Sequence, residues 1–144
     1  MMEVIKTILY SDVGSRLNNA GLLGFRVLLA IELFRVHGLK KFKVGEGQKE
    51  HVPNPFKLPE KVNAAMAMIS DTVIPFFVIF GLGSRLIVLP IICVTGIGYF
   101  VVHRKDSGEV RDVPYMYTLS FLLLFVFGFG TFSLDNLFYK WIFE

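Results

Sequence analysis

Four long apolar runs dominate this sequence and leave few folds open to it. They extend over Leu22–Leu39, Ala64–Gly83, Leu86–Val102 and Tyr115–Phe132. An α-helix rises about 1.5 Å per residue, so ~20 residues cross the ~30 Å hydrocarbon core of a bilayer, and about 17–25 are tolerated. Each run has a length within or near this range, which predicts four membrane-spanning helices.

The last two of these runs contain no charged residue and no polar stripe. A helix on the surface of a soluble protein turns a polar face to water, and a strand would be shorter and would alternate. The whole chain is 53% hydrophobic and 19% charged, against roughly 45–50% and about 25% in soluble domains. We therefore expect an all-α fold, an integral membrane four-helix bundle that residues 1–144 form as a single domain.

The polar connections predict the orientation of the bundle. The connections Lys40–Lys61 and His103–Pro114 carry nine Lys and Arg residues, whereas the N-terminus, the hairpin Gly81–Arg85 and the C-terminus carry four. Because positive residues accumulate on the cytoplasmic side, the two long connections are expected there, in a multi-pass protein of the inner membrane. Within the spans, Pro75 should interrupt the second run, and Pro90 is tolerated in the first turn of the third.

Residues 1–20 precede the first run and lack the continuous apolar segment of a signal peptide. Apolar residues such as Val4, Ile8 and Leu9 recur at helical spacing there. The segment is therefore either a short helix in the membrane interface or a frayed end. At the other end of the chain, Ser133–Asp135 is expected to form a turn or a cap.

Charge and cysteine content exclude two classes of function. The net charge is +3, but the basic residues of Lys40–Lys61 are mixed with Glu46, Glu50 and Glu60. This mixture is typical of a solvated loop, so no nucleic-acid partner is expected. Cys93 is the single cysteine, so the chain cannot form an internal disulfide, a Cys-x-x-Cys pair or a cysteine zinc site.

Charged side chains inside the spans are the first candidates for a site. The first run contains Arg26, Glu32, Arg35 and His37, and the second contains Asp71. A charge near the bilayer centre costs about 2.5–3.5 kcal/mol on insertion scales, so such residues usually face the bundle interior and pair. Glu32 and Arg35 are three residues apart and can pair with each other. Asp71 should lie at a similar depth, within reach of Arg26 or Arg35.

Three interpretations of this polar cluster stay open. It could be an ion-paired cluster that fixes helix packing, or a ligand, quinone or proton site. Snorkelling toward the interface is the third possibility, and it is easiest for Arg35.

The two histidines at the span ends also allow two interpretations. His37 and His103 lie at span ends on the same membrane side. They could converge into a pair that titrates or binds a metal, with Asp106, Glu109 or Asp112 nearby, or they could stay separate at the interface. We predict no metal site.

Four short motifs, each at the boundary of a span, resemble the DoxX family of small four-helix membrane proteins. They are Arg26 followed by His37-Gly38-Leu39-Lys40-Lys41-Phe42, the hairpin Gly81-Leu82-Gly83-Ser84-Arg85-Leu86, the entry Asp112-Val113-Pro114-Tyr115-Met116-Tyr117, and the segment Gly128-Phe129-Gly130-Thr131-Phe132-Ser133-Leu134-Asp135. The resemblance covers about residues 20–137. The chain departs from the family pattern at Asp71 and Asp112, where Glu is usual, at Phe129 for Pro, and at Phe132 for a Tyr whose hydroxyl is therefore missing.

The resemblance implies a function in membrane redox chemistry, because named DoxX members are associated with thiosulfate oxidation and quinone reduction. We predict an auxiliary subunit of a quinone-linked system, with a quinone held among Arg26, Asp71 and His37, and leave open whether the chain is itself an enzyme. The expected partners are the lipid bilayer, a redox subunit and further copies of the chain. The full set of candidate site residues is Arg26, Glu32, Arg35, His37, Lys41, Asp71, Arg85, His103, Asp112, Tyr117 and Asp135.

Two other functions are compatible with the same residues. Buried charges could line a proton or anion path in a small transporter or permeation module, which with four helices would have to oligomerise. Alternatively, the mixed-charge, proline-containing connection Lys40–Lys61 could dock soluble proteins, so that the chain would act as a membrane scaffold.

Overall fold

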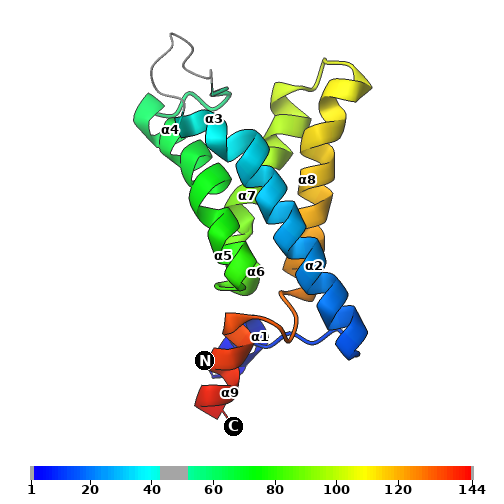
Figure 1. Cartoon of the computed structure of the whole chain (residues 1–144). Coiled ribbons are helices and arrows are strands. Elements are labelled where there is room, and N and C mark those ends of the chain that lie inside the picture. Colours follow the sequence, from blue (N-terminus) through cyan, green and yellow to red (C-terminus); the bar gives the residue numbers. More distant parts are fainter. Residues whose placement is uncertain (1, 43–51, 144) are drawn as a thin grey trace.

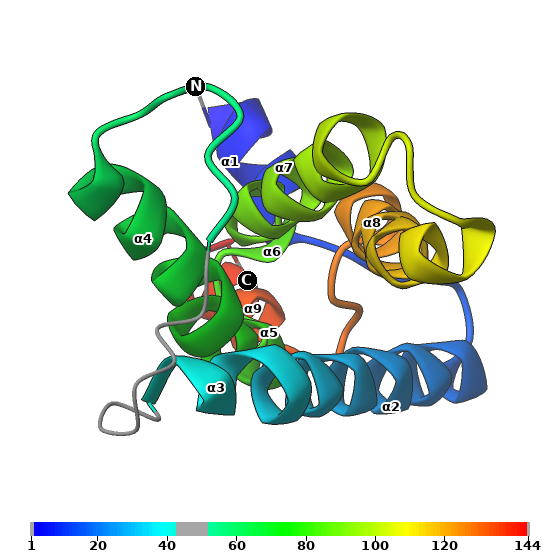
Figure 2. The same cartoon turned by 90° about the horizontal axis from the view of Figure 1, so that it is seen from above.

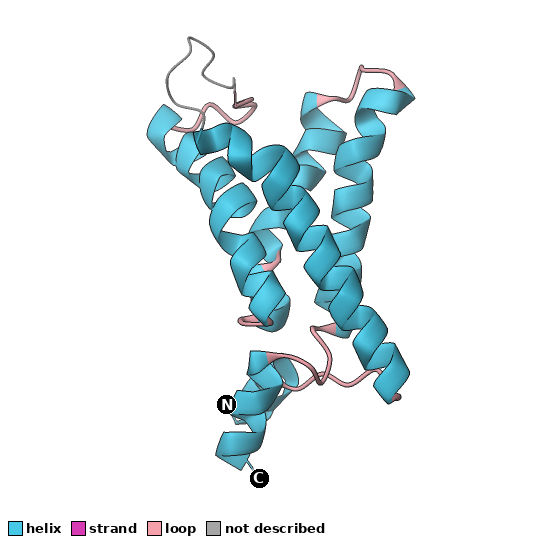
Figure 3. Cartoon of the chain, in the orientation of Figure 1, coloured by secondary structure: helices cyan, strands magenta, loops and turns pink. Residues whose placement is uncertain are grey.

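The computed structural model describes residues 2–42 and 52–143, and over these ranges it is helical with no strand (Figures 1 and 3). The elements are α1 (Met2–Leu9), α2 (Arg16–Leu33), η1 (Phe34–Gly38), α3 (Leu39–Phe42), α4 (Glu60–Met68), η2 (Ile69–Val73), α5 (Ile74–Phe80), α6 (Ser84–Ile87), α7 (Leu89–Ile97), η3 (Gly98–Val102), α8 (Gly108–Phe127) and α9 (Leu134–Phe143). Elements labelled η are single turns of π-helix. The all-α prediction is confirmed. Part of the expected docking connection, residues 43–51, lies outside the described ranges.

Three helices of the described chain are long and apolar enough to cross a membrane. They are Glu60–Phe80, Arg85–Val102 and Gly108–Phe127, which correspond to the second, third and fourth predicted runs. The first run is helical too, since α2, η1 and α3 follow one another without a break from Arg16 to Phe42. This helix is not among the three. It carries Arg26, Glu32 and Arg35 in its interior, whereas most charged residues of the other three lie in their first turns.

Most apolar side chains of the three spans face outward rather than into the protein. Only 33%, 11% and 17% of the three spans are buried, and residues such as Phe100 and Val126 are more than half exposed. Lipid tails, unlike water, impose no free-energy cost on such a surface. The outward apolar surface therefore supports the expectation that this is a membrane-type protein.

A small core holds the helices together. Ala30 and Leu33 of α2 pack with Val78 of α5, and Ile91 of α7 packs with Phe121 of α8, all essentially inaccessible. Burial of one such large side chain stabilises a fold by about 1.5–3 kcal/mol in water, but between membrane helices close packing and hydrogen bonds matter more. The Thr118 hydroxyl donates such a bond to Thr95 across α7 and α8, at 2.9 Å.

The helices form two packed pairs. The contacts that join α2 to α5 and α7 to α8 are the most extensive between different helices. Viewed from above, α2 runs along one side of the bundle, while α7 and α8 lie together on another (Figure 2). Both termini, α1 and α9 lie at one end of the bundle, and α3 and the start of α4 lie at the other (Figure 1).

Of three prolines within the spans, Pro90 acts as expected, whereas Pro75 and Pro114 do not. Pro75 is the second residue of α5, which directly follows the π-turn η2; the helix Glu60–Phe80 continues through this irregular turn rather than being broken. Pro90 lies in the first turn of α7. Pro114 was expected in a connection, but α8 begins at Gly108 and contains it. Pro114 is the seventh residue of α8, so it removes the backbone hydrogen bond that this position would donate to the Val110 carbonyl.

The ends of the chain differ most from expectation. The fourth span stops at Phe127 rather than Phe132, because Gly128 and Gly130 take positive φ angles of 74° and 75° that no other residue adopts without strain. Of the two alternatives for Ser133–Asp135, the cap is confirmed: the Ser133 hydroxyl accepts from the Asn136 N–H at 3.2 Å and caps a further helix, α9. At the N-terminus, α1 shows that the helical alternative was right and the frayed end wrong.

Candidate functional site

A groove lies between the α2 side and the α8 side of the bundle, with a volume of about 420 Å³. We call it the α2–α8 groove. Its lining is mostly apolar with a few polar groups: Leu29, Glu32, Val36, His37, Asp112, Val113, Met116, Tyr117 and Ser120. Val113 and Met116 are about half exposed, at 49% and 52%, so the groove is accessible from the outward surface of α8.

The sequence pattern explains why α8 supplies five of these side chains. Asp112, Met116 and Ser120 are spaced four residues apart, and Val113 and Tyr117 follow each of the first two by one. At 3.6 residues per turn these positions share one face of a helix. Leu29, Glu32 and Val36 form the matching stripe on α2 and η1.

Glu32 and Arg35 form an ion pair at the edge of the groove. The Arg35 guanidinium donates two hydrogen bonds to the Glu32 carboxylate, from Nη2 at 2.8 Å and from Nε at 3.0 Å. The Arg35 side chain is 65% exposed and the Glu32 side chain is 48% exposed. The pairing predicted from their three-residue spacing is confirmed, and it neutralises two charges on an outward face.

His37 and Tyr117 meet at the inner side of the groove. Their rings are in edge-to-face contact, with centroids 5.5 Å apart, and both side chains are half-buried. The Tyr117 hydroxyl lies close enough to Glu32, Arg35 and Asp71 to interact electrostatically with all three. The two rings therefore join the apolar groove to the charged residues of the first two runs.

Asp71 pairs with Lys41 rather than with the expected Arg26 or Arg35. The Lys41 Nζ lies 3.7 Å from the Asp71 carboxylate, and the two side chains are 14% and 15% exposed. The contact depends on a close approach of η1 and η2, because a Cβ on Gly38 would collide with the backbone carbonyl of Asp71. Asp71 lies near the middle of Glu60–Phe80, as expected, but it is level with Gly38 rather than with Glu32.

Arg26 belongs to a second polar cluster, near the other end of the bundle. Its side chain is 1% exposed and donates hydrogen bonds to the carbonyl oxygens of Phe129 at 3.3 Å and Phe132 at 2.6 Å. The guanidinium also stacks over the Phe129 ring, 5.3 Å from its centroid, and interacts electrostatically with Asp135. Gly81 leaves the room for it, because a Cβ there would collide with Nη1.

Asp135 fixes the same cluster to the hairpin between α5 and α6. Its carboxylate accepts a hydrogen bond of 3.0 Å from the Gly83 N–H, and its own N–H donates to the Gly81 carbonyl at 3.0 Å. Asn19 and Ser11 accept from the N–H groups of Thr131 and Gly130. The second cluster therefore closes one end of the bundle and is distinct from the groove.

Arg85 and His103 make contacts outside both clusters. The Arg85 guanidinium donates to the carbonyl oxygens of Thr7 at 2.7 Å and Tyr10 at 3.4 Å, so it caps the C-terminal end of α1. His103 pairs with Asp106 at 2.7 Å, whereas His37 packs on Tyr117. Across the described ranges, no three His, Cys, Asp or Glu side chains are grouped to hold a metal ion.

Four of the sequence-based candidates line the groove: Glu32, His37, Asp112 and Tyr117. A fifth, Asp71, lies behind it and interacts electrostatically with Tyr117. Sequence reasoning missed the apolar lining and Ser120, although the four-residue spacing on α8 signals them. It also missed Asn19 and Asn136, which are 2% exposed. Their signal is weak, because an isolated asparagine does not reveal which distant loop it will bind.

Comparison with known proteins agrees with this architecture. The model of a family described as DoxX matches residues 21–104. A protein of Haemophilus influenzae, described as an uncharacterized protein, is 31% identical over 134 residues, which cover 85% of this chain and 86% of its own length. No solved structure matches the chain.

Proposed function

The chain belongs to the DoxX family, and on that premise we propose that it is a multi-pass inner-membrane protein whose α2–α8 groove binds a quinone-like ring. It would serve as an auxiliary subunit of a quinone-linked redox system. The observation that carries the proposal is the groove itself, an apolar space on the outward surface with His37, Tyr117 and Ser120 among its lining.

The continuous helix Arg16–Phe42 would be the fourth transmembrane helix. Its charges are arranged in a way that suits a span: Arg26 is buried against loop carbonyls, and Glu32 is paired with Arg35. The same outward face carries the apolar Leu28, which is 70% exposed, beside this ion pair. Paired or inward-facing charges are the form in which membrane spans accommodate them, which supports a four-helix bundle.

The size and chemistry of the groove suit a ring with two carbonyl groups. Its volume of about 420 Å³ falls within the range of about 300–1,000 Å³ that small-molecule sites occupy. The hydroxyl groups of Tyr117 and Ser120 can donate to carbonyl oxygens, and so can a ring nitrogen of His37. Leu29, Val36 and Met116 supply apolar contact on the remaining surface.

The route into the groove also suits a lipid-soluble ligand. Because Val113 and Met116 line the groove and are half exposed on the surface of a span, a molecule dissolved in the bilayer could enter sideways. Only His37 of the trio Arg26, Asp71 and His37 lines the groove, so ring contacts are assigned to His37 and Tyr117. Arg26 would hold the bundle end, and Asp71 would act electrostatically on Tyr117 from behind.

A partner subunit would supply the electrons. The lone Cys93 gives the chain no dithiol couple of its own, so electron transfer to a bound quinone requires a second redox protein. We place this partner subunit at the polar end of the bundle, which carries α3 and the start of α4.

The test is photolabelling of the purified full chain in lipid nanodiscs with an azido-quinone, followed by mass mapping. We expect label on α8 and on η1, and competition by unlabelled quinone. Met116→Trp fills the groove and should abolish specific labelling. Met68→Trp is the matched control, because Met68 is 44% exposed on α4 and lies outside the groove. Equal labelling of both variants would contradict the proposal.

A transport function is the second candidate, and the acidic lining favours it. Glu32 and Asp112 both line the groove, and carboxylates beside an aromatic ring attract an amphipathic cation. A fluorescent aromatic cation of similar size should then compete with the azido-quinone and cross liposomes that contain the protein. If the cation crosses those liposomes and quinone neither binds nor competes, transport replaces the redox assignment.

A further inference from the structure

The C-terminal helix α9 has an apolar face that is largely exposed in the described part of the chain. Leu137, Phe138, Trp141 and Ile142 are 61%, 45%, 83% and 55% exposed. Their spacing of one, three and one residues places them on a single side of the helix. Asn136, which is 2% exposed, lies on the opposite side, as do Tyr139 and Phe143, which pack against Tyr10 and Lys6. The pattern is that of an amphipathic helix.

The start of α9 is level with the ends of the spans. The Asp135 N–H bonds to the carbonyl of Gly81, the residue that directly follows α5. Along the chain, α9 begins at Leu134, after a short loop from the end of α8 at Phe127. The helix therefore begins where the apolar spans stop, and it continues beyond the bundle (Figure 1).

The depth that α9 reaches corresponds to the interfacial layer. Ten residues of helix extend about 15 Å if the axis is straight. A bilayer has a hydrocarbon core of ~30 Å and a total thickness of about 40–45 Å, so each interfacial layer adds roughly 5–8 Å. A helix that starts at the core boundary keeps its exposed side chains in the headgroup region if its axis is inclined toward the membrane plane, because its full length along the bilayer normal would exceed one interfacial layer.

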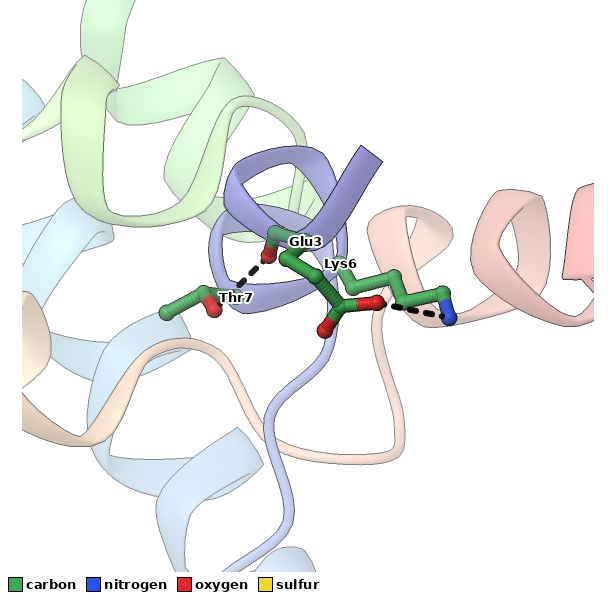
Figure 4. A network of polar contacts seen from close by, with 3 residues as sticks. All are labelled: Glu3, Lys6 and Thr7. Carbon is green, nitrogen blue, oxygen red and sulfur yellow. Dashed lines mark hydrogen bonds and ion pairs between the residues drawn. The ribbon is translucent and has the colours of Figure 1, made fainter. Parts of the chain in front are cut away.

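Contacts with α1 hold α9 in this position. The two helices pack on each other, with Tyr10 and Tyr139 rings 4.9 Å apart and Lys6 5.5 Å from the Phe143 ring centroid. Figure 4 shows α1 from close by, with Lys6 paired to Glu3 at 3.2 Å and the Thr7 hydroxyl bonded to the Glu3 carbonyl at 2.9 Å. Because Arg85 caps α1, both end helices are fixed to the bundle.

We infer that the exposed face of α9 lies in the lipid interface of the same bilayer and anchors the chain there, with Trp141 at the level of the headgroups. Three observations support lipid as the occupant. Helix α9 begins beside the end of α5, whose last residue, Phe80, is 57% exposed, so the helix starts next to the outward apolar surface of a span. Tyr10, Tyr139 and Trp141 gather at this end, and Tyr and Trp concentrate at membrane interfaces. Lys140 stands beside Trp141, where its ammonium can reach lipid phosphates.

The single tryptophan of the chain is the probe for a direct test. The full-length protein is reconstituted into phosphatidylcholine vesicles whose acyl chains carry bromine either near the headgroup or near the chain end. We expect a blue-shifted emission of Trp141 and a larger loss of emission with the shallow bromines than with the deep ones. Aqueous iodide should quench it weakly.

Two variants calibrate the depth. Trp141→Phe combined with Leu119→Trp places the probe near the middle of α8, where Leu119 is 43% exposed, and deep bromines should quench it most. Trp141→Phe combined with Lys105→Trp places it in the connection before α8, where iodide should quench it most. Each variant keeps all other contacts of α1 and α9, so differences report depth rather than folding.

Two outcomes overturn the inference. If iodide quenches Trp141 as strongly as the probe at position 105, and neither bromolipid affects it, the face of α9 lies in water. If no quencher reaches Trp141 and its emission shifts when the protein is diluted into excess lipid, a second copy of the chain covers the face. The groove proposal stands or falls separately, because its test uses Met116.

Discussion

The Nη2 atom of Arg26 donates a hydrogen bond of 2.6 Å to the carbonyl oxygen of Phe132, 106 residues further along the chain. A buried guanidinium is thereby used to hold a loop rather than a ligand. Backbone carbonyls without partners are costly in an apolar setting, and the loop after α8 has its Phe129 and Phe132 carbonyls turned inward. One long cationic side chain satisfies both.

Arg26→Ala should therefore destabilise the fold without touching the groove. Each buried acceptor left without its donor costs about 1–3 kcal/mol, and two carbonyl oxygens are affected. Arg26→Lys should recover only part of the loss, because an ammonium lacks the planar fork that reaches two carbonyls at once. Thermal unfolding of the purified protein in mild detergent measures both changes.

Arg35→Ala is the control for this experiment, since Arg35 is an exposed arginine of the same helical region with a single carboxylate partner. Its unfolding temperature should stay close to that of the unaltered chain. A similar loss of stability in Arg35→Ala and Arg26→Ala would show that the buried hydrogen bonds to Phe129 and Phe132 are not the cause.

Gly81→Ala tests the space that Arg26 needs. Gly81 has a φ angle of 73°, and an added Cβ would collide with the Arg26 guanidinium and with Ser133. The backbone strain costs about 1–2 kcal/mol, and displacement of Arg26 adds to it. Gly14→Ala provides the comparison, because Gly14 also has a positive φ, 92°, but has open space around it. We expect a clearly lower unfolding temperature for Gly81→Ala; equal effects would refute the close-contact argument.

The four runs and their helical state could be predicted from the sequence, because apolar length and the lack of alternation suffice for that. The Glu32–Arg35 pair could be predicted as well, since its geometry is local. The partner of Asp71 could not, because it depends on the π-turns η1 and η2 and on the close approach at Gly38. Arguments from periodicity assume a regular α-helix, whereas a π-turn rotates every later side chain about the helix axis.

The boundaries of α8 and the existence of α9 show a second limit. The segment from Tyr115 to Phe132 contains no charged residue and is mostly apolar, so hydropathy alone gives no reason to end the helix at Phe127. Gly128 and Gly130 end it through their backbone conformation. The role of Asp135 follows only once α9 is recognised, because its carboxylate binds a backbone N–H in the distant hairpin at Gly83.

Asp12 should give the stability of the chain a dependence on acid pH. Hydrogen bonds from the Asn19 side chain at 2.7 Å and the Gly14 N–H at 2.9 Å lower the pKa of the Asp12 carboxyl below its ordinary value of 3.8. A lowered pKa in the folded state means that the ionised form stabilises the fold above the unfolded pKa, and that this contribution is lost as the pH falls through the folded value.

The measurement compares the unfolding temperature of Asp12→Asn and of the unaltered chain at neutral pH and below pH 3.8. The asparagine keeps an oxygen that can accept from Gly14 but has no charge to lose. The unaltered chain should be the more stable of the two at neutral pH, and the difference should shrink in acid. A difference that is the same at both pH values would show that the Asp12 charge contributes nothing.

Tyr117→Phe should weaken quinone binding in the groove and leave the fold intact. The change removes only the hydroxyl, so the edge-to-face contact of the ring with His37 stays, while a carbonyl in the groove loses one donor. A hydrogen bond between neutral groups contributes about 0.5–1.5 kcal/mol, which corresponds to a rise in Kd of roughly 2- to 12-fold. Tyr115→Phe is the matched control, because Tyr115 lies two residues away, packs on Tyr99 and does not line the groove. Competition titrations against the azido-quinone in nanodiscs give the Kd for each variant. An unchanged Kd for Tyr117→Phe, or an equal rise for both variants, would exclude the Tyr117 hydroxyl as the group that orients the ring.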